Sequence, residues 1–227
     1  SMTDNLTLAT QAIQKIDPKL KEKFLIVAKF LEVEPSLRPS IRGGRGLVFG
    51  SREYFDRLAE VFVNGRHPKA PQPPSTVPDE LVSVVLNSYF NIPIKDLNRV
   101  KHEHQLLMAS ENIVGNLLER YISSQLEKYS WVWCSGEVVK SVDFIKPPTK
   151  VREPWAALQV KNRDNSENSS SAAIRHGTMI TKWYRTKSRT GQTMWDYFPD
   201  SVAVKHLSEE GLVKFATTFL ENIRKNL

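Results

Sequence analysis

Cysteine is scarce in the sequence and long apolar runs are absent, and both absences narrow the classes of protein to consider. Cys134 is the single cysteine among 227 residues, so one chain can build neither a disulfide framework nor a cysteine-rich zinc site. No apolar run reaches the length that spans a bilayer, and the polar start SMTDNLTLATQ is unlike a signal peptide. We therefore expect a cytoplasmic protein with no membrane partner.

Two further stretches lack the features of a cofactor site. The glycine-rich stretch IRGGRGLVFG at 41–50 has no Gly-Lys-Ser/Thr ending, which a P-loop requires, so we expect no nucleotide cofactor. His102 and His104 flank Glu103, but two residues that are two positions apart on a helix point to different faces. This spacing argues against a zinc-binding histidine pair.

An excess of positive charge is the most informative feature that the composition does have. Lysine and arginine number 32 against 25 aspartates and glutamates, which gives a net charge of +7 and a pI near 9.4. This balance favours a polyanionic partner, with nucleic acid ahead of membrane because no basic amphipathic helix stands out. Many proteins of similar pI bind no nucleic acid, so composition alone leaves the question open.

Apolar spacing predicts a largely helical N-terminal region over residues 1–108. Apolar residues recur every three or four positions in several segments, and Pro78 and Asp79 suit the start of the last of these. Between them lie a Gly- and Pro-containing basic loop at 35–55 and a proline-rich connector at 64–80. The predicted helices cover 7–16, 20–34 and 80–90.

The region 109–227 changes in pattern and predicts an α/β domain. Its elements are expected in the order helix, strand, strand, helix, strand, strand, helix, which is typical of a mixed central sheet flanked by helices. The strand at 155–162 is mostly apolar and is expected to be central. The predicted helices cover 110–129, with Ser110 as N-cap, 172–186 and 208–226, and the other strands cover 137–146, 190–199 and 201–207.

Three side chains on the first two of these strands form a candidate catalytic set. Gln159 and Lys161 are two residues apart, so a strand presents them on the same face. Asp143 joins them if the two strands pair. Oxygen ligands that hold a hard cation, together with a lysine that orients the attacking water, are what metal-dependent phosphodiester hydrolysis needs.

Asp143 followed by Gln159-x-Lys161 resembles the core of the PD-(D/E)XK nucleases, in the variant that has glutamine at the second acidic position. The resemblance covers about residues 108–205 and includes the preceding helix, where Glu119 matches a metal-binding glutamate, with Glu111 as the alternative. The sequence departs from the family motif in two places: no proline directly precedes Asp143, and Gln159 is neutral. The polar run after Lys161 is similar to that of SinI-like type II restriction endonucleases, which cut sites of the GGWCC or GGNCC type.

This resemblance implies a Mg²⁺-dependent endonuclease that cleaves double-stranded DNA as a homodimer. It implies that Asp143, Gln159 and Glu119 hold the metal and that Lys161 positions the nucleophilic water. The polar run after Lys161 is then expected to contact bases and backbone, and the Gly/Arg loop to lie in a groove. The expected DNA-binding residues are Asn162, Arg163, Asp164, Asn165, Asn168, Ser169, Ser170, Arg175, Arg42 and Arg45.

Two alternative functions remain open at the level of the sequence. A DNA repair or junction-resolving nuclease would share the core, although it would need less base readout than the polar run after Lys161 suggests. A non-catalytic DNA-binding protein on the same fold is the other alternative, because the neutral Gln159 removes one charge from the metal site.

Overall fold

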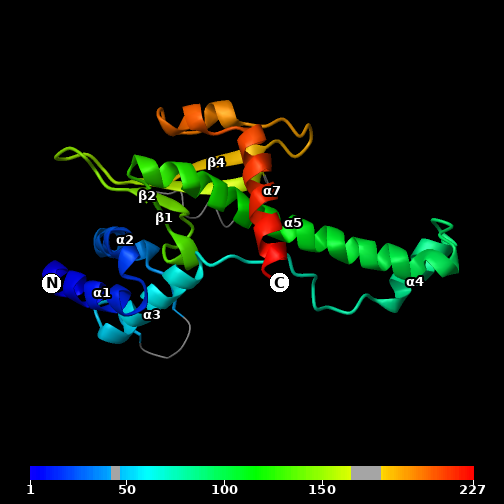
Figure 1. Cartoon of the computed structure of the whole chain (residues 1–227), viewed down its shortest axis with the longest axis horizontal. Coiled ribbons are helices and arrows are strands. Elements are labelled where there is room, and N and C mark those ends of the chain that lie inside the picture. Colours follow the sequence, from blue (N-terminus) through cyan, green and yellow to red (C-terminus); the bar gives the residue numbers. More distant parts are fainter. Residues whose placement is uncertain (42–46, 165–179) are drawn as a thin grey trace.

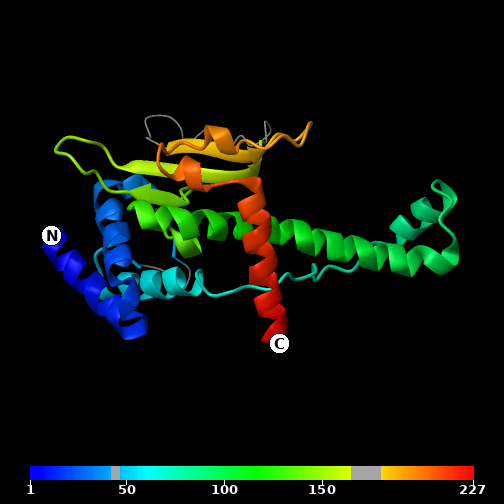
Figure 2. The same ribbon diagram turned by 45° about the horizontal axis from the view of Figure 1, so that its top comes forward.

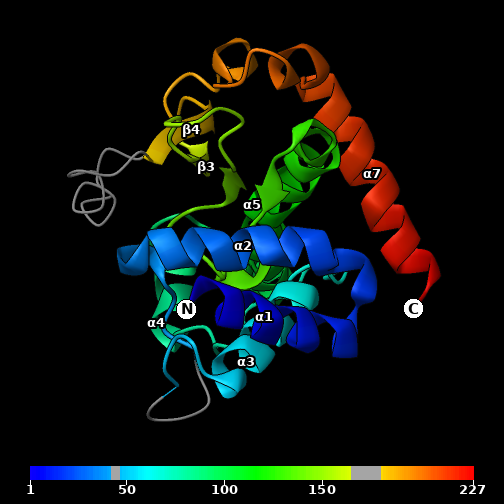
Figure 3. The ribbon, with the colours of Figure 1, turned by 90° about the vertical axis from the view of Figure 1, so that its left-hand side faces the viewer.

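A computed structural model describes residues 1–41, 47–164 and 180–227 of the chain. Three helices, α1 (Met2–Ile16), α2 (Lys21–Val33) and α3 (Arg52–Asn64), pack together at the N-terminus (Figures 1 and 3). The first two agree with the predicted helices. Helix α3 was not predicted, although the sequence carries its signal: the Ser51 side chain caps the helix by accepting from the Tyr54 N–H, and apolar residues follow at helical spacing.

A long helical hairpin follows the proline-rich connector. Helix α4 (Glu80–Ser88) begins as predicted, with the Asp79 carboxylate accepting from the Leu81 N–H at 2.8 Å. Helix α5 (Leu97–Leu126) is continuous over 30 residues, so the predicted N-cap at Ser110 is wrong. The Ser110 hydroxyl instead donates to the Leu106 carbonyl at 2.8 Å, a back-bond that lets serine sit inside a helix. The expected boundary at residue 108 falls within α5.

The described strands form one mixed sheet in the order β1 (Val132–Trp133), β2 (Phe144–Lys146), β3 (Ala156–Arg163) and β4 (Ile180–Thr186). The β1–β2 and β2–β3 pairs are antiparallel, and β3–β4 is parallel. The predicted pairing beside the 155–162 strand and its interior position are confirmed. The α/β fold with a mixed sheet flanked by helices and a helical N-terminal region is therefore as expected.

The sheet separates two hydrophobic cores, because alternate residues of a strand point to opposite faces. Ile145 and Ala157 pair across β2 and β3 and pack with the N-terminal helices. Phe144 and Leu158, the neighbouring pair, pack on the other face against α5 and the closing helix α7 (Glu209–Lys225). Both layers of helices are visible in Figures 2 and 3. The N-terminal helices are thus an integral part of the fold.

Several predicted elements of the second half are wrong. Residues 180–186 were assigned to a helix but form β4, because their backbone pairs with β3. The predicted strands at 190–199 and 201–207 contain 3₁₀ turns instead, Trp195–Tyr197 and Ala203–His206. The predicted strand at 137–146 is shortened to β2. The closing helix is confirmed, with the Ser208 hydroxyl as its cap.

None of the helices in the three described ranges has both the length and the apolar content that a membrane span requires.

Candidate active site

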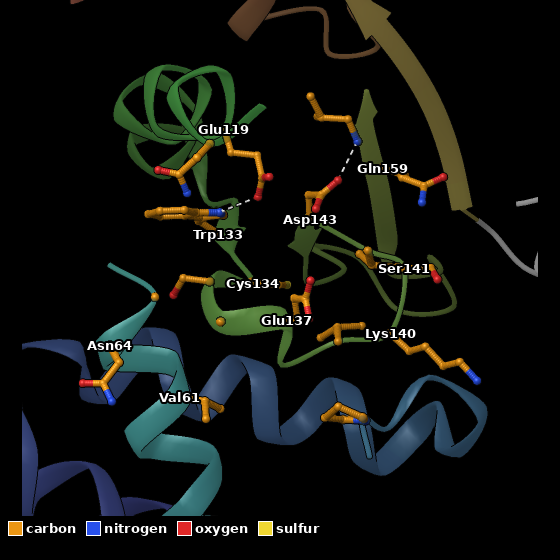
Figure 4. A pocket seen from close by; sticks show the side chains of 18 of the residues that line it. Val61, Asn64, Glu119, Trp133, Cys134, Glu137, Lys140, Ser141, Asp143 and Gln159 are labelled. Atoms are coloured by element: carbon orange, nitrogen blue, oxygen red, sulfur yellow. Dashed lines mark hydrogen bonds between the residues drawn. The ribbon is translucent and has the colours of Figure 1, made fainter. Parts of the chain in front are cut away.

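The four predicted catalytic side chains line one pocket of about 1050 Å³ (Figure 4). The pocket lies between the end of α3, the second half of α5, the end of β1, the segment that leads into β2, and strand β3. Glu119 comes from α5, Asp143 lies immediately before β2, and Gln159 and Lys161 belong to β3. Glu111, the alternative to Glu119, is exposed on α5 and does not line the pocket. The fold therefore brings together the residues that the sequence predicted.

The pairing of β2 with β3 fixes the position of Asp143. Its backbone N–H donates to the Leu158 carbonyl at 2.9 Å, and its Oδ2 accepts from the Val160 N–H at 2.7 Å. Burial raises the pKa of Asp143 to about 6, against the opposing effects of the Val160 hydrogen bond and the positive charge of Lys161. The carboxylate is thus buried, anchored to the backbone of β3 and within electrostatic reach of Lys161.

Glu119 faces Asp143 across the pocket, and its side chain is held by one indole. Its Oε1 accepts from Trp133 Nε1 at 3.1 Å. Burial, and next the negative charge of Asp143, raise the pKa of Glu119 to about 8. With pKa values of about 8 and about 6, the two carboxyl groups together hold close to one proton at neutral pH.

Trp133 is a positioning residue that the sequence did not single out. The guanidinium groups of Arg66 and Arg120 lie 5.3 and 5.4 Å from the centre of its ring. Arg66 also donates to the Trp133 carbonyl at 2.8 Å and forms two hydrogen bonds with Glu127, at 2.9 and 3.0 Å. The indole was interpreted as a core residue, which its burial supports, but its N–H also orients Glu119.

Gln159 and Lys161 differ in their surroundings although they share a face of β3. Gln159 is buried, with 8% of its surface exposed, and pairs in register with Lys182 of β4. In Figure 4 it lies on the other side of the β3 ribbon from Asp143. Lys161 is half-buried, and its charge favours the ionised form of Asp143. Lys161 is therefore coupled to Asp143 electrostatically, and Gln159 lines the same pocket.

The pair of Glu119 and Asp143 fits a divalent cation. Two buried carboxylates repel each other when both are ionised, and a cation between them removes that repulsion. In the part of the chain that the structure describes, no three His, Cys, Asp or Glu side chains are grouped so as to hold a metal ion. A cation here would therefore need further oxygen ligands, such as an amide, water or the phosphate of a bound DNA.

A third acidic residue, Glu137, also lines the pocket. Its negative charge adds to the raised pKa values of both Glu119 and Asp143. Sequence reasoning missed it because residue 137 was assigned to the start of a strand. It lies instead in a tight turn, where Gly136 and Glu137 both have left-handed backbone with φ of +72° and +58°. Such conformations are rare for glutamate, so tertiary contacts must hold the turn.

Gly136→Ala is expected to lower the free energy of unfolding by about 3 kcal/mol or more. A Cβ at this position would lie 1.9 Å from the Val61 carbonyl oxygen, and its φ of +72° disfavours any L side chain. The matched control is Gly115→Ala on α5, where a Cβ meets nothing within 4 Å, and which should stabilise the protein by about 0.5–1 kcal/mol. Urea denaturation measures both, and equal effects would contradict the strained turn.

The residues that follow Lys161 have mixed surroundings. Arg163 ends β3 on the same face as Lys161 and is exposed. Asn162 accepts a short hydrogen bond from Arg185, and Asp164 accepts from the Ser188 N–H at 2.7 Å. Both side chains are therefore engaged within the protein. The other expected DNA contacts, Asn165, Asn168, Ser169, Ser170, Arg175, Arg42 and Arg45, lie outside the described residues.

Comparison with known proteins shows the family to which this chain belongs. The family model described as SinI restriction endonuclease matches residues 5–222. The chain is 49% identical over 218 residues to the type II restriction enzyme SinI of Salmonella infantis, covering 96% of this chain and 94% of that protein. It is also 49% identical over 218 residues to the type II restriction enzyme Eco47I of Escherichia coli, covering 95% and 94%. The chain therefore belongs to the SinI restriction endonuclease family and is a type II restriction endonuclease, an enzyme that cleaves DNA at specific sites.

Proposed function

We propose that this enzyme hydrolyses both strands of double-stranded DNA with Mg²⁺ held by Asp143 and Glu119, assisted by Gln159, while Lys161 positions the attacking water. The observation that carries the proposal is the buried Glu119–Asp143 pair. Burial raises the pKa of both carboxyl groups, the charge of Asp143 raises that of Glu119 further, and the charge of Lys161 acts on Asp143 in the opposite direction. Perturbed pKa values of this kind cluster at catalytic sites. Oxygen ligands from carboxylates are what Mg²⁺ prefers.

In this mechanism the protein supplies orientation and charge. A bound Mg²⁺ would polarise the scissile phosphate and make a water molecule more acidic. The Val160 N–H keeps the Asp143 carboxylate in one orientation, and the Trp133 indole does the same for Glu119. A bound cation would favour the ionised form of Glu119. The Lys161 ammonium orients the water and stabilises the negative charge that develops on the phosphate.

The recognition sequence is proposed to be of the GGWCC or GGNCC type. The proposal rests on the resemblance of the polar run after Lys161 to SinI-like enzymes and on the 49% identity to enzymes of that kind. Guanine presents O6 and N7 in the major groove, and arginine binds both at once. Arg163 suits this role because it is exposed and lies two residues beyond Lys161 on the same face of β3.

Arg163→Ala is expected to reduce the preference for the specific site over a single-base variant by about 1–3 kcal/mol, if the guanidinium contacts guanine. Competition binding with the two duplexes, in Ca²⁺ to prevent cleavage, measures this difference. A matched control is Arg189→Ala, another exposed arginine, which lies beyond β4. Loss of affinity that is equal for both duplexes would indicate a phosphate contact instead.

A homodimer is the expected assembly of the active enzyme. Cutting both strands of a nearly palindromic site needs two active sites, and the pocket described above occurs once in each chain. Two copies related by a two-fold axis would match the symmetry of such a site.

The experiment that tests the proposed function is incubation with unmethylated phage DNA and Mg²⁺, with EDTA and Lys161→Ala as controls. Discrete bands that need both Mg²⁺ and Lys161 are expected, and the fragment ends give the recognition sequence. Tight, salt-sensitive DNA binding without cleavage in Mg²⁺ would contradict the assigned metal chemistry. Gln159→Glu would then be the first variant to test, because it adds a carboxylate to the metal site.

A further inference from the structure

The hairpin of α4 and the first half of α5 projects from the body of the protein (Figures 1 and 2). We call residues 79–108 the arm. Helix α4 has no buried residue, although five of its nine residues are valine or leucine. The arm therefore presents large apolar side chains to water. The most exposed are Leu81 (64%), Val84 (54%), Tyr89 (77%), Phe90 (60%), Ile94 (76%) and Leu107 (57%).

Such a large exposed apolar surface indicates that the arm binds a partner. A nine-residue helix is marginal in water unless it buries an apolar face, and among the described elements α5 is the one with which α4 makes more than marginal contact. Contiguous apolar patches on a monomer usually mark sites of protein association. The arm is also separate from the active site, because the residues that line the catalytic pocket come from α5 only at Asn116 and Glu119. Covering the arm would leave that pocket open to DNA.

The charge of the arm restricts what the partner can be. The arm carries three basic residues (Lys95, Arg99 and Lys101) and four acidic ones (Asp79, Glu80, Asp96 and Glu103), whereas the whole chain has a net charge of +7. A nearly neutral apolar surface has no attraction for the phosphates of DNA or for an anionic membrane. Two identical arms, by contrast, would meet with little repulsion.

The arm carries both a groove and a protruding aromatic tip. A groove of about 450 Å³ lies between α4, α5 and the end of the proline-rich connector, with Val82, Leu86, Val100 and Met108 among its walls. At the tip of the same hairpin, Tyr89 and Phe90 pack edge to face, with ring centres 5.0 Å apart, and both protrude. In a two-fold contact one surface meets its own copy, so the aromatic tip of each arm can enter the groove of the other.

We infer that the arm is the dimerisation element of this enzyme and that its partner is the arm of a second copy of the chain. The inference deepens the proposed function, since it rests on the homodimer expected there. The two hairpins together form a four-helix arrangement, which buries the apolar faces that a single hairpin leaves in water. Because no residue of the arm lines the catalytic pocket, this contact leaves the pocket of each chain uncovered.

Sedimentation of the full chain and of Phe90→Glu, over a range of concentrations, tests the inference. The wild type is expected to be a dimer, and Phe90→Glu to raise the dimer dissociation constant about 30-fold or more, as loss of a central interface residue does. The matched control is Val213→Glu on α7, 57% exposed and outside the arm, which should remain dimeric. Circular dichroism checks that both variants fold.

The possible outcomes distinguish a failure of the arm as the dimer interface from a failure of the proposed function. A dimeric wild type whose dissociation constant Phe90→Glu leaves unchanged would overturn the arm as the interface, while the homodimer stands. A wild type that stays monomeric with and without DNA would overturn both, and one that floats with phosphatidylglycerol vesicles would assign the arm to a lipid surface. If Phe90→Glu does not fold, hydrogen exchange of wild-type α4 decides: its amides should gain protection as protein concentration rises, and constant exchange would refute the contact.

Discussion

Lys161→Ala is expected to slow DNA cleavage by about 10²–10⁴-fold while specific DNA binding stays nearly unchanged. Lys161 is half-buried in the pocket, and its charge stabilises the ionised form of Asp143. In the proposed mechanism, removing the ammonium takes away the group that would orient the water and offset negative charge on the phosphate, and neither of these roles is needed to hold the DNA in place. The fall should therefore be in the rate of the chemical step.

Single-turnover cleavage at saturating protein isolates that step from binding. Lys140→Ala is the matched control, because Lys140 also lines the pocket but points away from the carboxylates in Figure 4. It should retain most of the cleavage rate. If Lys161→Ala lost DNA affinity but cleaved at the wild-type rate once saturated, Lys161 would be a phosphate-binding residue and its catalytic role would be refuted.

Glu119→Gln is expected to weaken divalent-cation binding by more than about 10–100-fold, the loss that changes outside the ligand shell already cause. The amide keeps an oxygen to accept the Trp133 N–H, so the geometry of the side chain is preserved. It removes one of the two carboxylates that the cation would bind. Calorimetric titration with Mn²⁺ measures the affinity, and Glu111→Gln, on the exposed side of the same helix, should bind as the wild type does.

The same substitution should change how stability depends on pH without metal. The pKa of Glu119 is about 8 in the folded protein, against an ordinary value of 4.5. Between these pH values the folded state binds more protons than the unfolded state, so the metal-free wild type loses stability as pH rises from 4.5 to about 8, and this loss levels off at higher pH. Glutamine has no proton to lose. The Tm of Glu119→Gln should therefore exceed that of the wild type at pH 9, by about 2–4 °C for each kcal/mol relieved.

Thermal unfolding in EDTA at pH 5 and pH 9 provides the comparison. The difference in Tm between Glu119→Gln and the wild type should be larger at pH 9. An equal difference at both pH values would mean that Glu119 is ionised throughout, and that the two carboxyl groups do not compete for charge. The metal-binding result is independent of this one, so the two measurements test the pair separately.

The catalytic set could be predicted from the sequence because its signals are local. The mostly apolar segment from Trp155 to Val160 specifies a strand that is buried on both faces, and the shared face of Gln159 and Lys161 follows from its two-residue period. The signals for the helix starts at Asp79 and Ser208 are equally local, since each side chain caps a backbone N–H two or three residues ahead. Glu119 needed the resemblance to a nuclease core as well.

Only the tertiary structure decided the features that depend on distant pairing. Residues 180–186 have a pattern that fits helix or strand, and the parallel ladder with β3 selects the strand. Trp133 reaches Glu119 because α5 packs beside β1, and Glu137 enters the pocket because Gly136 lies against the Val61 carbonyl of α3. Backbone pairing and burial join segments far apart in the chain. The sequence therefore determined which residues form the candidate catalytic set, and packing determined which neighbours orient them.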